Sequence, residues 1–119
     1  MACHTILVGH DLGLLKTRAS LLQTASFTTT VGLGVETLTN QVALQRTDFV
    51  LLCHTLTAEE HRVAHQFLTS HAPHIKVLSL RRVNDKRLEI AGPQISTGEG
   101  PAALVKACTE LMRDCLHNS

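Results

Sequence analysis

The sequence predicts a single α/β domain in which helices cover both faces of a parallel β-sheet. Short apolar runs rich in β-branched residues alternate along the chain with longer segments whose apolar residues recur at helical spacing. Glycine or polar residues follow most of the apolar runs, as expected where strands end. A length of 119 residues fits one domain, residues 1–119, with one hydrophobic core.

Strands and helices alternate from the start of the chain. Residues 4–9 predict a buried strand, and Asp11 is placed to cap an amphipathic helix over residues 12–25. Residues 27–31 are rich in β-branched side chains and predict a second strand. A second helix is expected over residues 36–46.

The run over residues 48–53 predicts a central strand, because its apolar centre is uninterrupted up to Cys53. A helix over residues 58–70 follows, with Thr57 as its N-cap and Glu60 at capping-box spacing. Reactive groups collect at the carboxyl ends of strands in open α/β sheets, so Cys53 stands where a functional site is expected.

The last part of the chain completes the alternation. Residues 75–80 predict a fourth strand, and a fifth strand ends near residues 94–97. Pro101 opens a strong final helix that continues to about Cys115. The segment 81–97 is too short for a full helix, two loops and a strand, so the fourth helix is expected to be short or absent.

Composition argues against several classes of function. The chain has three phenylalanines, no tyrosine or tryptophan and a net charge of +1, which provides poorly for stacking on bases or for binding a phosphate backbone. The same near-neutral charge disfavours membrane surfaces. No basic region followed by a long apolar segment opens the chain, so a cytoplasmic location is expected.

The four cysteines are expected to be reduced thiols, since they show neither paired CxxC spacing nor the density of a secreted disulfide scaffold. Cys108 and Cys115 share one face of the last helix and are interpreted as small apolar core residues. No resident cofactor or metal ion is predicted.

Four segments together resemble the receiver domain of bacterial two-component response regulators: residues 6–11, 48–53, 76–80 and the helix opening at 101–104. The resemblance covers nearly the whole chain and implies a flavodoxin-like fold, a three-layer α/β/α sandwich with strand order 2-1-3-4-5. In that family two acidic residues after the first strand hold Mg²⁺, an aspartate ending the third strand accepts phosphate, a threonine or serine ends the fourth, and a lysine ends the fifth.

Transferred to this sequence, the family positions fall on His10, Asp11, Cys53, Arg81 and Thr97. Of these, Asp11 alone matches the family pattern. An acyl phosphate needs a carboxylate nucleophile, and Mg²⁺ prefers oxygen ligands, whereas Cys53 offers sulfur and His10 offers nitrogen. The resemblance therefore implies a pseudo-receiver that has lost aspartyl phosphorylation.

The positions of the switch hydroxyl and of the lysine, Arg81 and Thr97, also lack a match. Ser79 is the nearest hydroxyl in the fourth strand, but it lies two residues before the expected switch position. No lysine ends the fifth strand, because Lys86 precedes it and Lys106 lies within the last helix. We therefore expect a module that binds a protein partner and does not act as an enzyme, with a homodimer as one possibility.

Other chemistry at the strand ends remains open. His10, Asp11, Cys53 and His54 are expected to converge, and cysteine with histidine is a combination that binds zinc or forms a thiolate nucleophile. A small apolar thiol is the alternative. An apolar environment raises the pKa of such a thiol, whereas a protonated histidine lowers it.

Residues 10–13 also resemble the HxxG half of the DxHxxG signature of cobalamin-binding domains, which share this fold class. In those domains the histidine ligates cobalt, which would assign that role to His10. The leading acid of the signature falls on Val8, and the expected Gly-Gly after the fourth strand is replaced by Arg81 and Arg82.

Three surface features have both functional and plain structural interpretations. His61 and His65 share a helix face with His71 and His74 beyond it, which suits a transition metal, but charged neighbours favour a solvated face. The basic pairs Arg81-Arg82 and Lys86-Arg87 suit an acidic partner or are simply exposed. The last helix carries a set that forms either a self-association patch or part of the core: Leu111, Met112 and Leu116.

Overall fold

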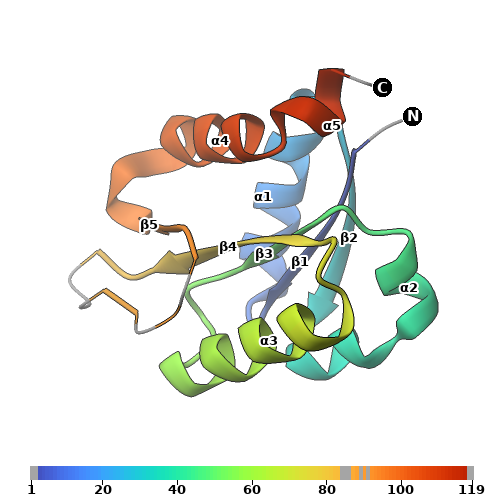
Figure 1. Ribbon diagram of the computed structural model, residues 1–119. Helices are drawn as coiled ribbons and strands as arrows, with labels where there is room; N and C mark the ends of the chain where they lie inside the picture. Colours follow the sequence, from blue (N-terminus) through green and yellow to red (C-terminus); the bar gives the residue numbers. More distant parts are fainter. Residues whose placement is uncertain (1–2, 84–86, 89, 91, 118–119) are drawn as a thin grey trace.

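The computed structural model describes residues 3–83, 87–88, 90 and 92–117. Its five strands form one parallel sheet in the order β2-β1-β3-β4-β5, which confirms the predicted topology (Figure 1). The strands are β1 (Cys3–Gly9), β2 (Phe27–Leu33), β3 (Phe49–Leu52), β4 (Lys76–Arg81) and β5 (Gln94–Ser96).

The helices lie in two layers, one on each face of the sheet, as Figure 1 shows. One layer holds α1 (Leu12–Thr24) and α4 (Gly100–Leu111). The other holds α3 (Ala58–His71), the 3₁₀ helix η1 (Val35–Thr39) and the short α2 (Gln41–Gln45). A second 3₁₀ helix, η2 (Thr97–Glu99), precedes α4, and α5 (Arg113–His117) follows it.

Two apolar clusters fill the spaces between the layers. Alternate residues of each strand point to opposite faces, so Leu51 and Leu78 pack beneath α1 and α4 while Val50 and Leu52 pack against α3. The central strands are apolar on both sides because both faces of the sheet are covered.

Both predicted N-caps are present. The Asp11 carboxylate accepts a hydrogen bond from the Leu14 amide at 3.1 Å at the start of α1. At the start of α3, the Glu60 amide donates to the Thr57 hydroxyl at 3.1 Å, and the Thr57 amide donates to the Glu60 carboxylate at 2.9 Å. This capping box was readable from the sequence, because its partners are only three residues apart.

The single helix predicted over residues 36–46 is wrong. The segment divides into η1 and α2 at Asn40, whose backbone is extended (φ −76°, ψ 98°) and whose side chain accepts a hydrogen bond from the Ala43 amide at 3.2 Å. Asparagine side chains offer the backbone this alternative to a continuous helix, so Asn40 begins a new helix instead of continuing the old one.

The final helix is also divided, with Met112 between α4 and α5. Met112 is buried, and Leu111 and Leu116 are half-buried against the same core cluster. Their side chains therefore take the core role left open by the sequence.

Between β4 and β5, the described residues of segment 82–93 form no helix, in agreement with the expectation that the fourth helix is short or absent. Lys86, half of one predicted basic pair, lies outside the described residues. None of the helices in the described ranges combines the length and hydropathy that crossing a bilayer requires.

Candidate functional site

The residues at the family positions gather at the carboxyl edge of the sheet. His10 and Asp11 follow β1, Cys53 follows β3, Arg81 ends β4 and Thr97 follows β5. Parallel strands bring their carboxyl ends to one edge, and this is why residues far apart in sequence meet there.

Cys53 is fully buried in the cluster beneath α1 and α4. Its amide donates to the Val8 carbonyl at 2.8 Å, extending the β1–β3 hydrogen-bond pattern by one residue. Burial raises the pKa of the Cys53 thiol, and the nearby Arg18 guanidinium opposes that rise without reversing it. A buried thiol with a raised pKa is a neutral core group, not an activated nucleophile.

Arg18 supplies the positive charge at this edge. It extends from α1, and its Nη2 donates to Nδ1 of His54 at 3.1 Å. Burial lowers the pKa of His54, Arg18 and Arg82 lower it further, and Asp11 acts in the opposite direction. Arg18 falls within the amphipathic helix predicted over residues 12–25, and nothing local indicated a partner 36 residues away.

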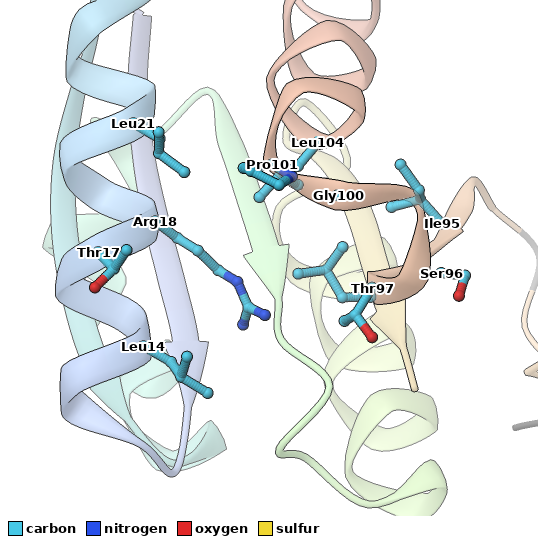
Figure 2. A pocket seen from close by; sticks show the side chains of 11 residues that line it. Leu14, Thr17, Arg18, Leu21, Ile95, Ser96, Thr97, Gly100, Pro101 and Leu104 are labelled. Carbon is cyan, nitrogen blue, oxygen red and sulfur yellow. The ribbon is translucent and has the colours of Figure 1, made fainter. Parts of the chain in front are cut away.

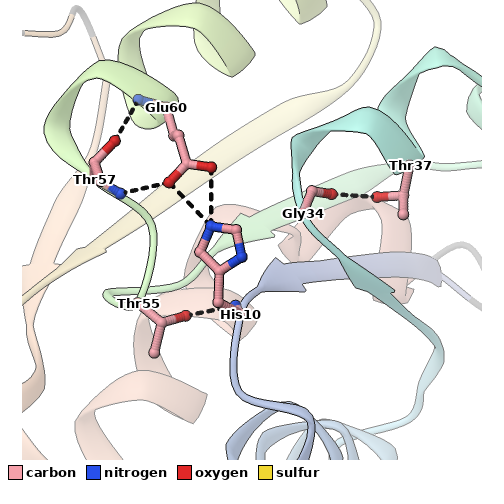
Figure 3. A network of polar contacts seen from close by, with 6 residues as sticks. All are labelled: His10, Gly34, Thr37, Thr55, Thr57 and Glu60. Carbon is pink, nitrogen blue, oxygen red and sulfur yellow. Dashed lines mark hydrogen bonds and ion pairs between the residues drawn. The ribbon is translucent and has the colours of Figure 1, made fainter.

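His10 is tied to α3 by Glu60, whose predicted role is helix capping alone. Nε2 of His10 lies 2.9 Å and 3.0 Å from the two carboxylate oxygens of Glu60, as Figure 3 shows. The His10 amide donates to the Thr55 hydroxyl at 2.8 Å. A Cβ at Gly9 would lie 2.7 Å from that hydroxyl, so glycine is needed for the close approach.

Glu60 therefore serves two functions, as capping residue and as ion-pair partner. Its pKa is lowered mainly by the hydrogen bond from the Thr57 backbone, with a further contribution from His10. The acid nearest to His10 in this network thus comes from α3, whereas the carboxylate of Asp11, also at the edge, is engaged in capping α1. No spacing rule relates His10 to Glu60, which explains why the sequence did not reveal the pair.

The hydroxyl in β4 is on the wrong face to act near Cys53. Ser79 is paired in register with Leu52, and its neighbours Leu78 and Leu80 belong to the cluster that contains Cys53. Strand alternation therefore directs the buried Ser79 side chain toward the α3 face. Arg81, two residues later, is half-buried at the strand end.

A cavity of about 160 Å³ lies between α1 and α4, next to this edge (Figure 2). Leu80, Ile95 and Leu104 give it an apolar floor, and Arg18 and Thr97 contribute polar groups. The remaining lining residues are Leu14, Thr17, Leu21, Ser96, Gly100 and Pro101.

The contacts at this edge also bear on the zinc, thiolate and cobalamin alternatives. Among the described residues, His10, Asp11, Cys53 and His54 form no group of three potential ligands close enough to share a metal ion. His10 uses Nε2 for Glu60, so cobalt ligation through that nitrogen would first require breaking the ion pair. Neither observation favours a thiolate, zinc or cobalamin function.

The solvated histidine face is wrong for His61. This residue is buried, and burial lowers the pKa of its imidazole, against a smaller opposing contribution from the Cys53 backbone. Its position fits the buried stripe of α3, which continues through Ala64 and Leu68 at helical spacing. His71, by contrast, is exposed and stacks on Phe67.

No known protein-family model matches the chain. The search of curated proteins returned no match either.

Solved structures, in contrast, share the whole fold. The chain is similar to the signal receiver domain of an HD-domain protein from Pseudomonas fluorescens, with 16% identity, a TM-score of 0.79 and full coverage of both chains. A response regulator from Thermotoga maritima has 17% identity and a TM-score of 0.76, with 95% of this chain and 99% of that chain covered.

A third similar structure comes from Saccharomyces cerevisiae: the receiver domain of a response regulator, crystallised with a histidine phosphotransfer signalling protein. Identity is 13%, the TM-score is 0.71, and 94% of this chain and 91% of that chain are covered. At these identities the comparisons establish the receiver-like, flavodoxin-like fold.

Proposed function

We propose that this chain is a cytoplasmic signalling module of the receiver type that acts by binding a protein partner, without aspartyl phosphorylation and without catalysis. One observation carries the proposal: the position of the phosphoacceptor holds Cys53, a fully buried thiol whose pKa is raised. A thiol cannot form an aspartyl phosphate, and this one is also shielded from a phosphodonor.

The surrounding charges support the same conclusion. An Mg²⁺ site needs several oxygen ligands, and the groups nearest Cys53 include Arg18 and His54, which offer nitrogen. Asp11 is the one acid at a family position, and its carboxylate caps α1. A divalent cation would meet positive charge here without the carboxylate pair that normally offsets it.

A fixed docking contact needs no phosphate-driven switch. In the receiver family the switch depends on a hydroxyl at the end of the fourth strand, and here Ser79 faces the opposite side of the sheet from Cys53. We therefore propose that the partner binds the conformation described here, in the absence of any modification.

We place the partner contact at the cavity between α1 and α4, which is open on one side and is called the groove from here on. Its apolar floor is open enough to receive a side chain, and Leu14 at its margin is 37% exposed. Arg18 would pair with an acidic residue beside that side chain. The yeast neighbour, a receiver domain crystallised with a phosphotransfer protein, supports protein binding by this fold in general and does not bear on the choice of the groove.

The first test asks whether the protein takes up phosphate. The protein is incubated with Mg²⁺ and acetyl phosphate beside an ordinary receiver domain as positive control, and intact mass is measured. We expect the mass of one phosphoryl group to be gained by the control alone. We also expect beryllofluoride to leave the amide NMR shifts around Cys53 and Asp11 unchanged. Stoichiometric phosphorylation at a carboxylate, abolished in Asp11→Asn, would contradict the proposal.

The second test locates the docking surface. Leu14→Glu places a charge at the groove, and Leu33→Glu is its matched control, since Leu33 is 52% exposed at the end of β2 and is not among the groove residues. The groove is supported as the contact if a protein binds the wild type and Leu33→Glu but does not bind Leu14→Glu. Equal binding by both variants would place the contact elsewhere.

A further inference from the structure

A second group of potential ligands lies at the opposite edge of the sheet from Cys53. Cys3 begins β1, Asp48 immediately precedes β3, and Cys115 lies on α5. The two sulfur atoms and a carboxylate oxygen all lie within 4.8 Å of one another. From the sequence, Cys115 is expected in the core, and Cys3 has no predicted role.

These three residues are held in place by the fold. The His4 amide donates to Oδ2 of Asp48 at 3.0 Å, and the Asp48 amide donates to the His4 carbonyl at 2.9 Å. Cys3 is fully buried in the apolar core beneath α1 and α4, and Cys115 is half-buried against the same core. Carboxylates that bind a metal ion are commonly oriented by a hydrogen bond of this kind.

We infer that Cys3, Asp48 and Cys115 form a binding site for a thiophilic divalent cation of the Zn²⁺ class. Zinc binds thiolates at about 2.3 Å and carboxylate oxygen at about 2.0–2.2 Å, so tetrahedral ligands stand about 3.6–3.8 Å apart. Atoms within 4.8 Å reach that spacing through side-chain movements of about 1 Å. The fourth position is left for water.

The electrostatics of the cluster favour a cation. In the described part of the chain, Asp48 has no ion pair that would offset its charge. A bound dication would supply that charge and convert both thiols to thiolates, releasing two protons to solvent.

A metal ion here would join the first strand to the last helix. It would bind the folded chain preferentially, because Cys3 and Cys115 are separated by most of the sequence in the unfolded state. Binding would therefore raise stability in proportion to the logarithm of the free metal concentration. This role is independent of the groove and of phosphate chemistry, so it stands or falls separately from the proposed function.

The test uses the full chain, reduced and freed of metal, with Co²⁺ as a spectroscopic probe and Zn²⁺ as competitor. We expect one equivalent of Co²⁺ to produce thiolate-to-cobalt charge-transfer absorption and strong visible bands of a tetrahedral site. Excess Zn²⁺ should remove both signals. Zn²⁺ should also raise the thermal unfolding temperature.

Variants separate this site from the other thiols. Cys115→Ser should lose the charge-transfer band and the thermal shift, and Asp48→Asn should weaken Co²⁺ binding by at least about tenfold. Cys108→Ala is the matched control, because Cys108 is a buried thiol one helix earlier and outside the cluster. It should bind Co²⁺ as the wild type does.

Two results would overturn the inference. One is the absence of Co²⁺ absorption in the reduced wild type, including the case in which air oxidation then yields a Cys3–Cys115 disulfide detected by peptide mapping. The other is retention of the absorption in a Cys115→Ser protein that is shown to be folded by its circular dichroism spectrum. Cys115 is only half-buried, so the serine variant is expected to fold.

Discussion

At the scale of single residues, burial decides what the ionisable groups of this protein do. Cys53 stays neutral because it lies inside the cluster beneath α1 and α4. His61 is neutral for a similar reason, because it lies on the buried side of α3, which covers the other face of the sheet. Neither side chain resembles an exposed surface ligand, although both stand near polar residues in the sequence.

His61 gives a pH prediction at this scale. Its folded-state pKa is lower than the ordinary value of 6.5, so the unfolded chain binds the proton more tightly. The contribution of neutral His61 to the free energy of unfolding is therefore fully present above pH 6.5. It declines as pH falls toward the folded-state pKa, by up to about 1.4 kcal/mol per pH unit. The pKa of His54 is also lowered, so its protonation likewise reduces stability as pH falls.

Urea unfolding at pH 7.5 and 5.5 measures this slope. His61→Gln should show a smaller loss of stability between the two pH values than the wild type, whatever its absolute stability. His65→Gln, four residues along the same helix, is the control and should retain the wild-type slope. Identical slopes in all three proteins would show that His61 does not titrate as described.

At the scale of secondary-structure elements, the start of α3 connects stability to the candidate site. Thr57 and Glu60 cap the helix, and the same Glu60 carboxylate contacts His10 after β1 (Figure 3). Fraying of this helix turn would therefore release His10 as well. Helix capping here positions groups at the carboxyl edge of the sheet.

Thr57→Ala tests the cap directly. Loss of the hydroxyl leaves the Glu60 amide without its partner and should lower the free energy of unfolding by about 1 kcal/mol. Thr57→Ser keeps the hydroxyl and should recover most of that stability in urea titrations. An alanine variant as stable as the wild type would mean that solvent replaces the cap at no cost.

At the scale of the whole molecule, three buried thiols make the fold sensitive to alkaline pH. Burial raises the pKa of Cys3, of Cys53 and of Cys108, the last to about 12. The ordinary thiol value is 9.0, so the unfolded chain ionises first as pH rises. Stability from these protons is complete below pH 9 and is lost above it.

In metal-free protein the free energy of unfolding should fall as pH rises above 9, by at most about 1.4 kcal/mol per pH unit for each thiol. Denaturation curves collected from pH 8 to 11 measure this slope. Cys108→Ala should make the slope shallower. An unchanged slope in that variant would assign the alkaline sensitivity to other groups.

Much of the fold was predictable because its signals are local. Apolar runs and helical spacing are read within a few residues, and alternation of strands with helices implies a parallel sheet. The caps at Asp11 and Thr57 were found for the same reason. The division at Asn40 was missed, because a side chain that caps a new helix and one within a continuous helix look alike in sequence.

The candidate site was less predictable because its contacts are long-range. Strand ends indicated that His10, Asp11 and Cys53 lie at one edge, but the partners Arg18 and Glu60 come from helices distant in sequence. Spacing along the chain says nothing about such pairs. The cluster at the opposite edge was missed for the same reason, since it brings the two ends of the sequence together.

The meeting of those ends also determines how the domain can be combined with other proteins. The start of β1 and α5 lie close together, because the sulfur atoms of Cys3 and Cys115 are within 4.8 Å of each other. A domain with adjacent ends can be inserted into a surface loop of a host protein, or circularly permuted through a short linker, without stretching its fold. Inserted in this way, it would keep the carboxyl edge and the α1–α4 groove directed away from the attachment point.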